Sequence, residues 1–394
     1  MRLLPALAVL GLSIFVWNRR RPGSFMFKRN LPVAFYAHGD ARSHCEVKHA
    51  PGLNSCEDAA FWDIHDPATN STQQVVLITC DPGRVDWNTV MGPLRNPDPH
   101  GNLWLLAMGK ESVPQRITFD NYPAGHDFHP LGIAISPFDG DTPSNLFIVN
   151  HARERTVIEQ FTMSPASAVA THVRTLSSPY FISPNSISLT SSSSFYVSND
   201  HFMTRRLPWG LGNVLPVIET FLTLPLGYVS HITLDPAPTA LKPILEHKFA
   251  ALFLPFANGV SISPDGLRVA IASSTPANVH IYSRNPANNV LKYVKRIPVQ
   301  FHPDNLDFDA TGALIISGHP HFFSLAKMKE DPAKLRAPSW VSALGVATDE
   351  VQTLFQSDGT YFSSSTTGLR DSKTNSLYVL GLYESGVLVC REGE

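Results

Sequence analysis

Short alternations of apolar and polar residues, separated by turn residues, run through nearly the whole chain. In the segment 256–274, FANGVSISPDGLRVAIASS, an alternating strand ends in a Pro-Asp-Gly turn and a second strand follows. After the N-terminus, no segment keeps the 3.6-residue periodicity of a helix over any length. The pattern therefore predicts an all-β main domain.

Four segments share one layout, in which a polar or special residue precedes an alternating strand, a turn and a second strand. The first strands lie within 129–140, 183–194, 256–266 and 302–312, and the second strands within 145–151, 194–200, 267–274 and 313–320. A unit that recurs about every 50 residues as antiparallel strands is typical of propeller blades. With the less regular ends included, we predict a six-bladed β-propeller over residues 31–394. The alternative, a β-sandwich, gives the recurring polar residue no purpose.

The polar residues at the strand starts suggest a site. In a propeller the innermost strand of each blade lines the central channel, so equivalent strand starts converge near one end of it. A ring of carboxylate and amide oxygens without thiolates or imidazoles suits a hard cation such as Ca²⁺. An acidic pair near the start, Glu57 and Asp58, could complete its charge. Each asparagine taken alone is equally explained as a turn residue bonding its own backbone. The strand-start residues are Asn185, Asn258, Asp304 and Asn305.

Composition and charge narrow the classes of partner. The chain has 394 residues with 32 Pro, 24 Gly and 16% charged residues, which argues against long helices. The formal net charge of −2 provides no basic field for nucleic acid. Small uncharged or zwitterionic molecules are the expected partners, and no nucleic acid is.

The first residues predict entry into the secretory pathway. The apolar run from Leu3 to Trp17 is shorter than the roughly 20 residues of a spanning helix and resembles a secretory signal. The following NRRRP at 18–22 lacks a small-residue cleavage site, so residues 1–30 are expected to form a signal anchor or an uncleaved signal helix. The protein is then secreted or membrane-anchored. Asn70, in Asn-Ser-Thr, is a candidate glycosylation site.

The four cysteines are an even set for a secretory protein, and three pairings are open. They are Cys45, Cys56, Cys80 and Cys390. A bond between Cys45 and Cys390 is of most interest, because it would join the two ends of the β-domain and limit fraying. Whether Cys56 bonds Cys80 stays open.

Several spaced motifs point to a known family. Five motifs occur in order along the chain, namely VNHARERTVIEQF (149–161), PNSISLTSSSSFYVSNDHF (184–202), FANGVSISPDG (256–266), HPDNLDFD (302–309) and GHP (318–320). CEDAAFWD precedes them and GVLVC follows them. Over residues 45–390 the chain resembles the serum paraoxonase/arylesterase family. The resemblance implies a six-bladed propeller with calcium on its axis, and hydrolysis of lactones and aryl esters.

The resemblance also assigns residues. The family's catalytic-calcium ligands match Glu57, Asn185, Asn258, Asp304 and Asn305, and its terminal disulfide matches Cys45 and Cys390. For a second, structural calcium, Asp58 and the Ile133 carbonyl match ligands. The family's aspartate in that site is Ser186 here, which puts the second ion in doubt.

The histidines depart from the family pattern. The histidine that the family uses to activate water is Leu131 here, whereas the family's second histidine matches His151. The family's histidine pair therefore cannot form as such. His129 would point to the same side of its strand as Leu131 and is a candidate replacement, or else a surface turn residue. His319 is a third candidate base, or a histidine bonded within a strand that lines the channel.

Residues 203–229 break the strand pattern with clustered apolar residues, including Trp209, Leu215, Ile218, Phe221 and Leu222. In the family the matching stretch covers the active site and touches lipid, while the alternative is an ordinary connection between blades. A lid here would favour apolar acyl chains or aromatic leaving groups. Residues 1–17 and 203–229 are thus the expected lipid contacts.

Three functions follow. The first is a calcium-dependent lactonase or arylesterase, in which calcium polarises the carbonyl and activated water attacks it. The second is a weak or inactive calcium-stabilised propeller that acts as a binding module, which Leu131 keeps open. The third is an enzyme of a neighbouring group, such as a gluconolactonase-like or strictosidine-synthase-like protein. Gly-x-Ser-x-Gly and His-Glu-x-x-His motifs are absent from the sequence.

Overall fold

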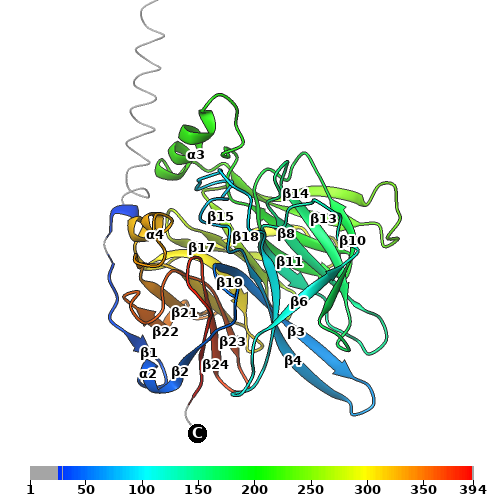
Figure 1. The fold of residues 1–394 in the computed structure, drawn as a ribbon, viewed down its shortest axis with the longest axis horizontal. Helices are drawn as coiled ribbons and strands as arrows, with labels where there is room; N and C mark the ends of the chain where they lie inside the picture. Colours follow the sequence, from blue (N-terminus) through cyan, green and yellow to red (C-terminus); the bar gives the residue numbers. More distant parts are fainter. Residues whose placement is uncertain (1–24, 29, 393–394) are drawn as a thin grey trace, which may run out of the picture.

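Antiparallel strands dominate the computed structural model, which describes residues 25–28 and 30–392 (Figure 1). One sheet runs in the order β3 (Cys56–Asp66), β4 (Ser71–Cys80), β5 (Asn102–Ala107), β6 (Gln115–Asp120), β10 (Val169–Leu176), β9 (Val157–Met163), β8 (Ser144–Asn150) and β7 (Pro130–Ile135). A second contains β11 (Pro184–Ser191), β12 (Ser194–Asn199), β13 (Gly227–Leu234) and β14 (Ile244–Leu254). A third contains β15 (Ala257–Ile262), β16 (Arg268–Ser273), β17 (Asn278–Arg284) and β18 (Leu291–Pro298).

Two further sheets include strands from the N-terminal part of the chain. One is β19 (His302–Phe308), β20 (Ala313–His319), β21 (Ser339–Gly345) and β22 (Glu350–Ser357), with β1 (Phe35–Tyr36) at its edge. The other is β23 (Ser365–Asp371), β24 (Ser376–Gly381), β25 (Val387–Cys390) and β2 (Cys45–Lys48). The four short helical segments are η1 (Phe25–Phe27), α2 (Ala41–His44), α3 (Leu211–Phe221) and α4 (Phe322–Met328).

The arrangement is propeller-like, as predicted, but the sheets number five among the described residues, where six separate blades were expected. The difference has a local cause. The outer strands β6 and β10 pair in parallel, through Val169 opposite Thr118 and the next two positions, and join two four-stranded units into one sheet. The innermost strands β3, β7, β11, β15, β19 and β23 each contact the next, and β23 contacts β3, so they form a closed ring.

The two ends of the chain meet in one sheet. β2 pairs antiparallel with β25, and Cys45 lies opposite Cys390 in this register. The two cysteines form a disulfide, as the family resemblance implied, and Cys56 bonds Cys80 in a second one. The N-terminal strand therefore completes the last sheet, and a covalent bond holds it there.

Every innermost strand has an irregularity near its start. The pairing register shifts between Cys56 and Asp58 in β3, and between Pro303 and Leu306 in β19. The other four innermost strands, β7, β11, β15 and β23, have a shift at the corresponding place. A bulge removes residues from the ladder and redirects their side chains. The polar residues at the strand starts lie within these bulges, which is why they face the ring's interior.

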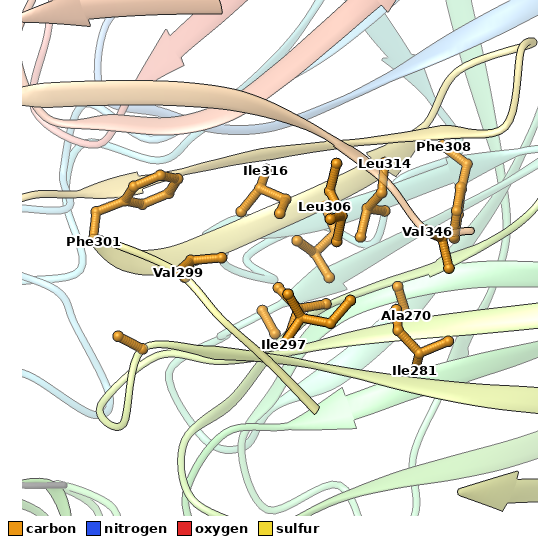
Figure 2. Close-up of a cluster of buried hydrophobic side chains, with 14 of the residues drawn as sticks. Ala270, Ile281, Ile297, Val299, Phe301, Leu306, Phe308, Leu314, Ile316 and Val346 are labelled. Atoms are coloured by element: carbon orange, nitrogen blue, oxygen red, sulfur yellow. The ribbon is translucent and has the colours of Figure 1, made fainter. Parts of the chain in front are cut away.

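Hydrophobic cores fill the spaces between neighbouring sheets. Figure 2 shows one of them, in which Ile281 and Ile297 of the third sheet pack against Leu306, Leu314 and Ile316 of the fourth. Each such side chain contributes roughly 1.5–3 kcal/mol when it is fully buried. These cores hold the sheets at fixed positions around the ring and so fix the bulged strand starts.

The structure corrects one expectation and leaves another untested. The segment 203–229 contains a helix, α3, although no helical period was found there, and α4 was also missed. Both lie at the same end of the molecule (Figure 1). The signal anchor or signal helix predicted over residues 1–30 falls mostly outside the described residues, which begin at Phe25. Within the described part of the chain, no helix is long and apolar enough to cross a membrane.

Candidate active site

Four of the five predicted calcium ligands line one cavity at the end of the ring. They are Glu57, Asn185, Asn258 and Asp304, from β3, β11, β15 and β19. The fifth, Asn305, follows Asp304, and its Nδ2 donates to Glu57 Oε1 over 3.2 Å. Asn258 Nδ2 likewise donates to Asp304 Oδ1. The bulged strand starts thus bring residues 57 to 305 into one connected cluster.

The cluster leaves buried oxygens without hydrogen-bond partners. Among the described residues, Glu57 Oε2 and the Oδ1 atoms of Asn185, Asn258 and Asn305 are buried and have no donor. Most buried polar atoms in proteins are paired, because an unpaired one costs about 1–3 kcal/mol. Four such oxygens in a single cluster are an arrangement that a bound hard cation would satisfy. The residues present therefore fit calcium.

The charges in the cluster point the same way. Burial raises the pKa of Glu57 well above its usual range, and repulsion from Asp58 and Asp304 raises it further. The cavity also contains Arg84, which partly offsets these charges. A cation would stabilise the ionised form of Glu57. Within the described part of the chain, no three or more His, Cys, Asp or Glu side chains are grouped so that they could hold a metal ion. The predicted calcium site differs from such a group because three of its five ligands are asparagine amides.

Residues predicted for the second calcium site are partly bonded to protein donors. The Asp58 carboxylate accepts hydrogen bonds from the backbone N–H of Ala59 (2.9 Å) and of Ile133 (3.1 Å), and from the Thr367 hydroxyl (3.1 Å). It therefore faces the N–H of Ile133. The Ser186 hydroxyl accepts from the backbone N–H of Val260 over 3.2 Å. Protein donors thus engage Asp58 and Ser186, while burial and the charges of Asp58 and Asp309 raise the pKa of Asp307, in the same cavity, to about 8.

His151 lines the cavity but has both ring nitrogens engaged. Its Nε2 lies 2.7 Å from the Pro184 carbonyl oxygen, which only accepts, so Nε2 carries the proton. Its Nδ1 then accepts from the Thr89 hydroxyl over 2.6 Å. Burial lowers the pKa of His151 to about 4. The family's matched histidine is therefore held neutral, with no nitrogen available to water.

Three other histidines line the cavity and keep one buried nitrogen without a partner among the residues described, namely His129, His302 and His319. His129 Nδ1 lies 3.1 Å from Asp81 Oδ2, and His319 Nε2 lies 2.7 Å from Asp304 Oδ2. His302 Nδ1 bonds the Ser274 carbonyl over 2.9 Å. His129 is 1% exposed, so it is not the surface turn residue considered as its alternative.

Apolar side chains form the upper walls of the cavity. They include Trp87, Leu131, Phe256, Phe322 and Leu325. A second cavity shares Val90, Met91 and Phe322 with the first and is also lined by Pro216, Val217 and Phe221 of α3. The helix within 203–229 thus lines a cavity that adjoins the first one.

The polar residues of the cavity that were not expected from the sequence include Asp81, Arg84, Asp200 and His302. Asp200 Oδ2 accepts from Asn185 Nδ2 over 3.3 Å, and Arg84 donates to the Pro130 carbonyl over 3.0 Å. An acid directly after a buried strand, as in the Ile-Thr-Cys-Asp of residues 78–81, was an available signal for Asp81. Only the fold shows that it meets His129.

The fold and the cavity define a propeller-like all-β protein with an oxygen-rich site at one end. A family model described as Arylesterase matches residues 93–383, and the chain belongs to this family. The matched range contains Asn185, Asn258, Asp304 and Asn305, whereas Glu57 lies before it.

Individual relatives are more distant. The chain is 28% identical to serum paraoxonase/lactonase 3 of Oryctolagus cuniculus, over 68% of this chain and 72% of that protein. It is 27% identical to serum paraoxonase/arylesterase 1 of Homo sapiens, over 57% of this chain and 59% of that protein. Among solved structures, a luciferin-regenerating enzyme matches with a TM-score of 0.51 at 12% identity, covering 89% of this chain and 95% of that one. That match supports the fold alone.

Proposed function

We propose that the protein is a calcium-dependent hydrolase of carboxylic esters, with lactones and aryl esters as substrates. One observation carries the proposal, namely the four buried oxygens of Glu57, Asn185, Asn258 and Asn305 that have no donor among the described residues. Glu57, Asn185 and Asn258 line an apolar cavity together with Asp304, and Asn305 bonds Glu57. The relatives are named paraoxonase, arylesterase and lactonase, and these names indicate the substrate class.

The five residues would hold the cation, which when bound supplies a Lewis acid for the ester carbonyl and the oxyanion that develops on it. The chain contributes the rest. The apolar walls around Trp87, Phe256 and Phe322 orient an apolar acyl or aryl group and exclude bulk water. A histidine of the cavity accepts a proton from the attacking water. Among the predicted bases His151 is disfavoured, because both of its ring nitrogens are engaged.

The proposal extends to the architecture and location. The ring of six innermost strands supports six blades, with β6–β10 pairing joining two of them within 31–394. Residues 1–30 act as signal or anchor, and the two disulfides support a secretory route. Asn70 is exposed at a turn between β3 and β4 and would accept a glycan. The exposed apolar residues Trp209, Val214 and Ile218 on and before α3 provide a lipid contact.

The second candidate, a binding module without catalysis, is favoured by one feature. Leu131 occupies the position of the family histidine, and His151 is held neutral between Thr89 and Pro184. A propeller that retains the cation for stability alone would show this pair of features.

Hydrolysis assays separate the two candidates. Purified protein is assayed with a panel of lactones and phenyl acetate, with calcium and after chelation, beside an Asn258→Ala variant. Calcium-dependent turnover that falls in the variant supports the hydrolase. Absence of turnover in a protein that still binds calcium, and that loses thermal stability on chelation, contradicts it and supports the binding module.

A further inference from the structure

A carboxylate and an imidazole lie side by side in the wall of the cavity. Asp81 Oδ2 and His129 Nδ1 are 3.1 Å apart, and each residue is 1% exposed. Asp81 directly follows β4, and His129 directly precedes β7, so they come from adjacent four-stranded units. Neither belongs to the proposed ligand set.

The pairing determines which ring nitrogen of His129 carries the proton. A carboxylate accepts hydrogen bonds, so Nδ1 carries the proton and Nε2 keeps its lone pair. Nε2 is buried and has no partner among the described residues, and His129 lines the cavity. This is the arrangement in which an imidazole accepts a proton from water.

The surrounding structure holds both side chains in place. Cys80, beside Asp81, bonds Cys56, which is next to Glu57. Asp81 Oδ1 accepts from the Gly83 N–H over 3.0 Å. The backbone N–H of His129 donates to Asn150 Oδ1 over 2.8 Å, and its ring packs at 5.5 Å from that of Trp87. The Cys56–Cys80 disulfide therefore connects Asp81 to Glu57 of the ligand cluster, because each of these residues is next to one of the two cysteines.

The other cavity histidines are less suited. His319 Nε2 bonds Asp304, a proposed ligand, so this imidazole is part of the ligand cluster. His302 has a carbonyl partner and no carboxylate, and burial lowers its pKa to about 4. His151 has no available nitrogen. Of the histidines described in the cavity, His129 alone is backed by a carboxylate outside the ligand cluster.

We infer that His129 is the general base that activates water in this hydrolase, and that Asp81 is its positioning residue. The inference rests on the proposed function. The pair takes the role that Leu131 and His151 cannot fill, and it uses a carboxylate–imidazole unit in place of two imidazoles.

His129 would act first as a base and then as an acid. His129 Nε2 takes a proton from water while the water oxygen bonds to the ester carbonyl carbon. The imidazolium then gives that proton to the leaving oxygen as the carbon–oxygen bond breaks, which regenerates neutral His129. The products are an alcohol or phenol and a carboxylic acid, or one hydroxy acid from a lactone. The Asp81 carboxylate holds the ring in place and stabilises the imidazolium.

The test is the pH profile of kcat/KM for phenyl acetate and a δ-lactone in saturating calcium. The variants are His129→Gln and Asp81→Asn, with His302→Gln and His319→Gln as rival bases. His280→Asn, a partly buried histidine on β17, is the control. The titratable groups that face His129 or share its cavity are Asp81, Arg84, His100, His151, Asp200, Glu57, Asp304, His302 and His319.

We expect His129→Gln to lower kcat/KM about 10²–10⁴-fold and to remove the acid limb of the profile. Asp81→Asn should lower it about 10²-fold and move the limb to lower pH, because the imidazolium loses its anionic partner. An unchanged limb in both variants overturns the inference while the hydrolase stands, and so does a limb that disappears in His302→Gln or His319→Gln. If the wild type hydrolyses nothing, the proposed function and the base fail together.

A second measurement does not depend on turnover. In chelator-treated, ¹⁵N-labelled wild-type protein, a long-range ¹H–¹⁵N spectrum distinguishes the two imidazole tautomers. The pair requires His129 to carry its proton on Nδ1. A proton on Nε2 would overturn the inference even if His129→Gln is inactive, because the loss would then come from altered folding.

Discussion

Two buried glutamates are treated in opposite ways by the same fold. Glu159, on β9, is fully buried, and its carboxylate is bonded by His126 (2.7 Å), His172 (3.1 Å), Thr175 (2.6 Å) and Asn150 (2.9 Å). Glu57, on β3, is 2% exposed; its Oε1 has Asn305, and its Oε2 has no partner among the described residues. Burial acts to raise the pKa of both. At Glu159 the hydrogen bonds outweigh burial and lower the pKa to about 2, whereas the pKa of Glu57 is raised.

The difference shows what each region lacks. The fold can surround a buried carboxylate with donors, as it does at Glu159; Asp58 has three donors as well, although burial still raises its pKa to about 7. Around Glu57 it places oxygens instead, from Asn185, Asn258 and Asn305. A region with acceptors and few donors requires a positive group from outside the chain. This difference is the physical reason for proposing a calcium site at Glu57 and not at Glu159.

The largest effect is expected at Glu57. Glu57→Gln should lower kcat/KM for lactones on the order of 10³-fold, because it removes a charged ligand from the proposed cation. Asp58→Asn, at the next residue, is the matched control and should reduce stability while lowering kcat/KM less than about tenfold. Equal losses of activity in the two variants would contradict the distinction between the two carboxylates.

Glu159→Gln should instead destabilise the fold by about 2–4 kcal/mol, because buried donors lose their anion. The Glu159 contribution is present above its unfolded pKa of about 4.5 and is lost as pH falls through about 2. The hydrogen bond to Glu159 raises the pKa of His126 in the folded protein. The stability that protonated His126 contributes is therefore complete below its unfolded pKa of about 6.5. It is lost as pH rises through the raised pKa of the folded state.

Denaturant unfolding of wild type and Glu159→Gln across pH 5–9 measures this. The difference should be largest between pH 5 and 6.5 and should decrease toward pH 9. Glu46→Gln, which alters a half-exposed ion pair with Arg391, is the control and should cost less than about 1 kcal/mol. A difference that grows with pH would show that the pair does not act as described.

Calcium should stabilise the wild type. A ligand that binds only the folded state at 100 times its Kd contributes about 2.7 kcal/mol, and chelation should remove that contribution. Glu57→Gln should show little response to calcium. Thermal scans with and without chelator measure this, and an equal calcium response in wild type and variant would place the cation elsewhere.

A smaller effect is expected where the bulges of adjacent strands meet. A Cβ at Gly259 would lie 2.6 Å from the Leu306 nitrogen and 2.7 Å from the Asn305 Cα, so Gly259→Ala must displace backbone beside two proposed ligands. It should cost about 1–3 kcal/mol and weaken calcium binding. Gly109→Ala is the control, since a Cβ there meets nothing within 4 Å. Unchanged calcium affinity in Gly259→Ala would show that the bulge does not position the ligands.

Much of the fold could be predicted from the sequence because its strands are short and sharply bounded. The segments 256–266 and 302–312 contain β15 and β19, and the cysteine pair at the chain ends matches the observed bond. The parallel contact between β6 and β10 was not predictable, because alternation describes one strand and not its neighbour across an edge. α3 was missed because Pro216 and a wide apolar face obscure its helical period.

At the site, recurring polar strand starts indicated which residues converge, because equivalent positions in a ring meet at its axis. Their order in sequence could not show which oxygens lack donors. Glu57 and Asp58 are adjacent in sequence. They differ because Ile133 and Thr367 donate hydrogen bonds to Asp58. His129 and Asp81 are 48 positions apart in sequence, and they meet only because two four-stranded units pack side by side.

The most direct test is a calorimetric titration of chelator-stripped protein with calcium. The account predicts one tight site per chain, whose binding heat is lost in Glu57→Gln and in Asn258→Ala and is retained in Asp58→Asn. No binding by the wild type, or a site that persists unchanged in both ligand variants, would contradict the claim that the unpartnered oxygens form a cation site.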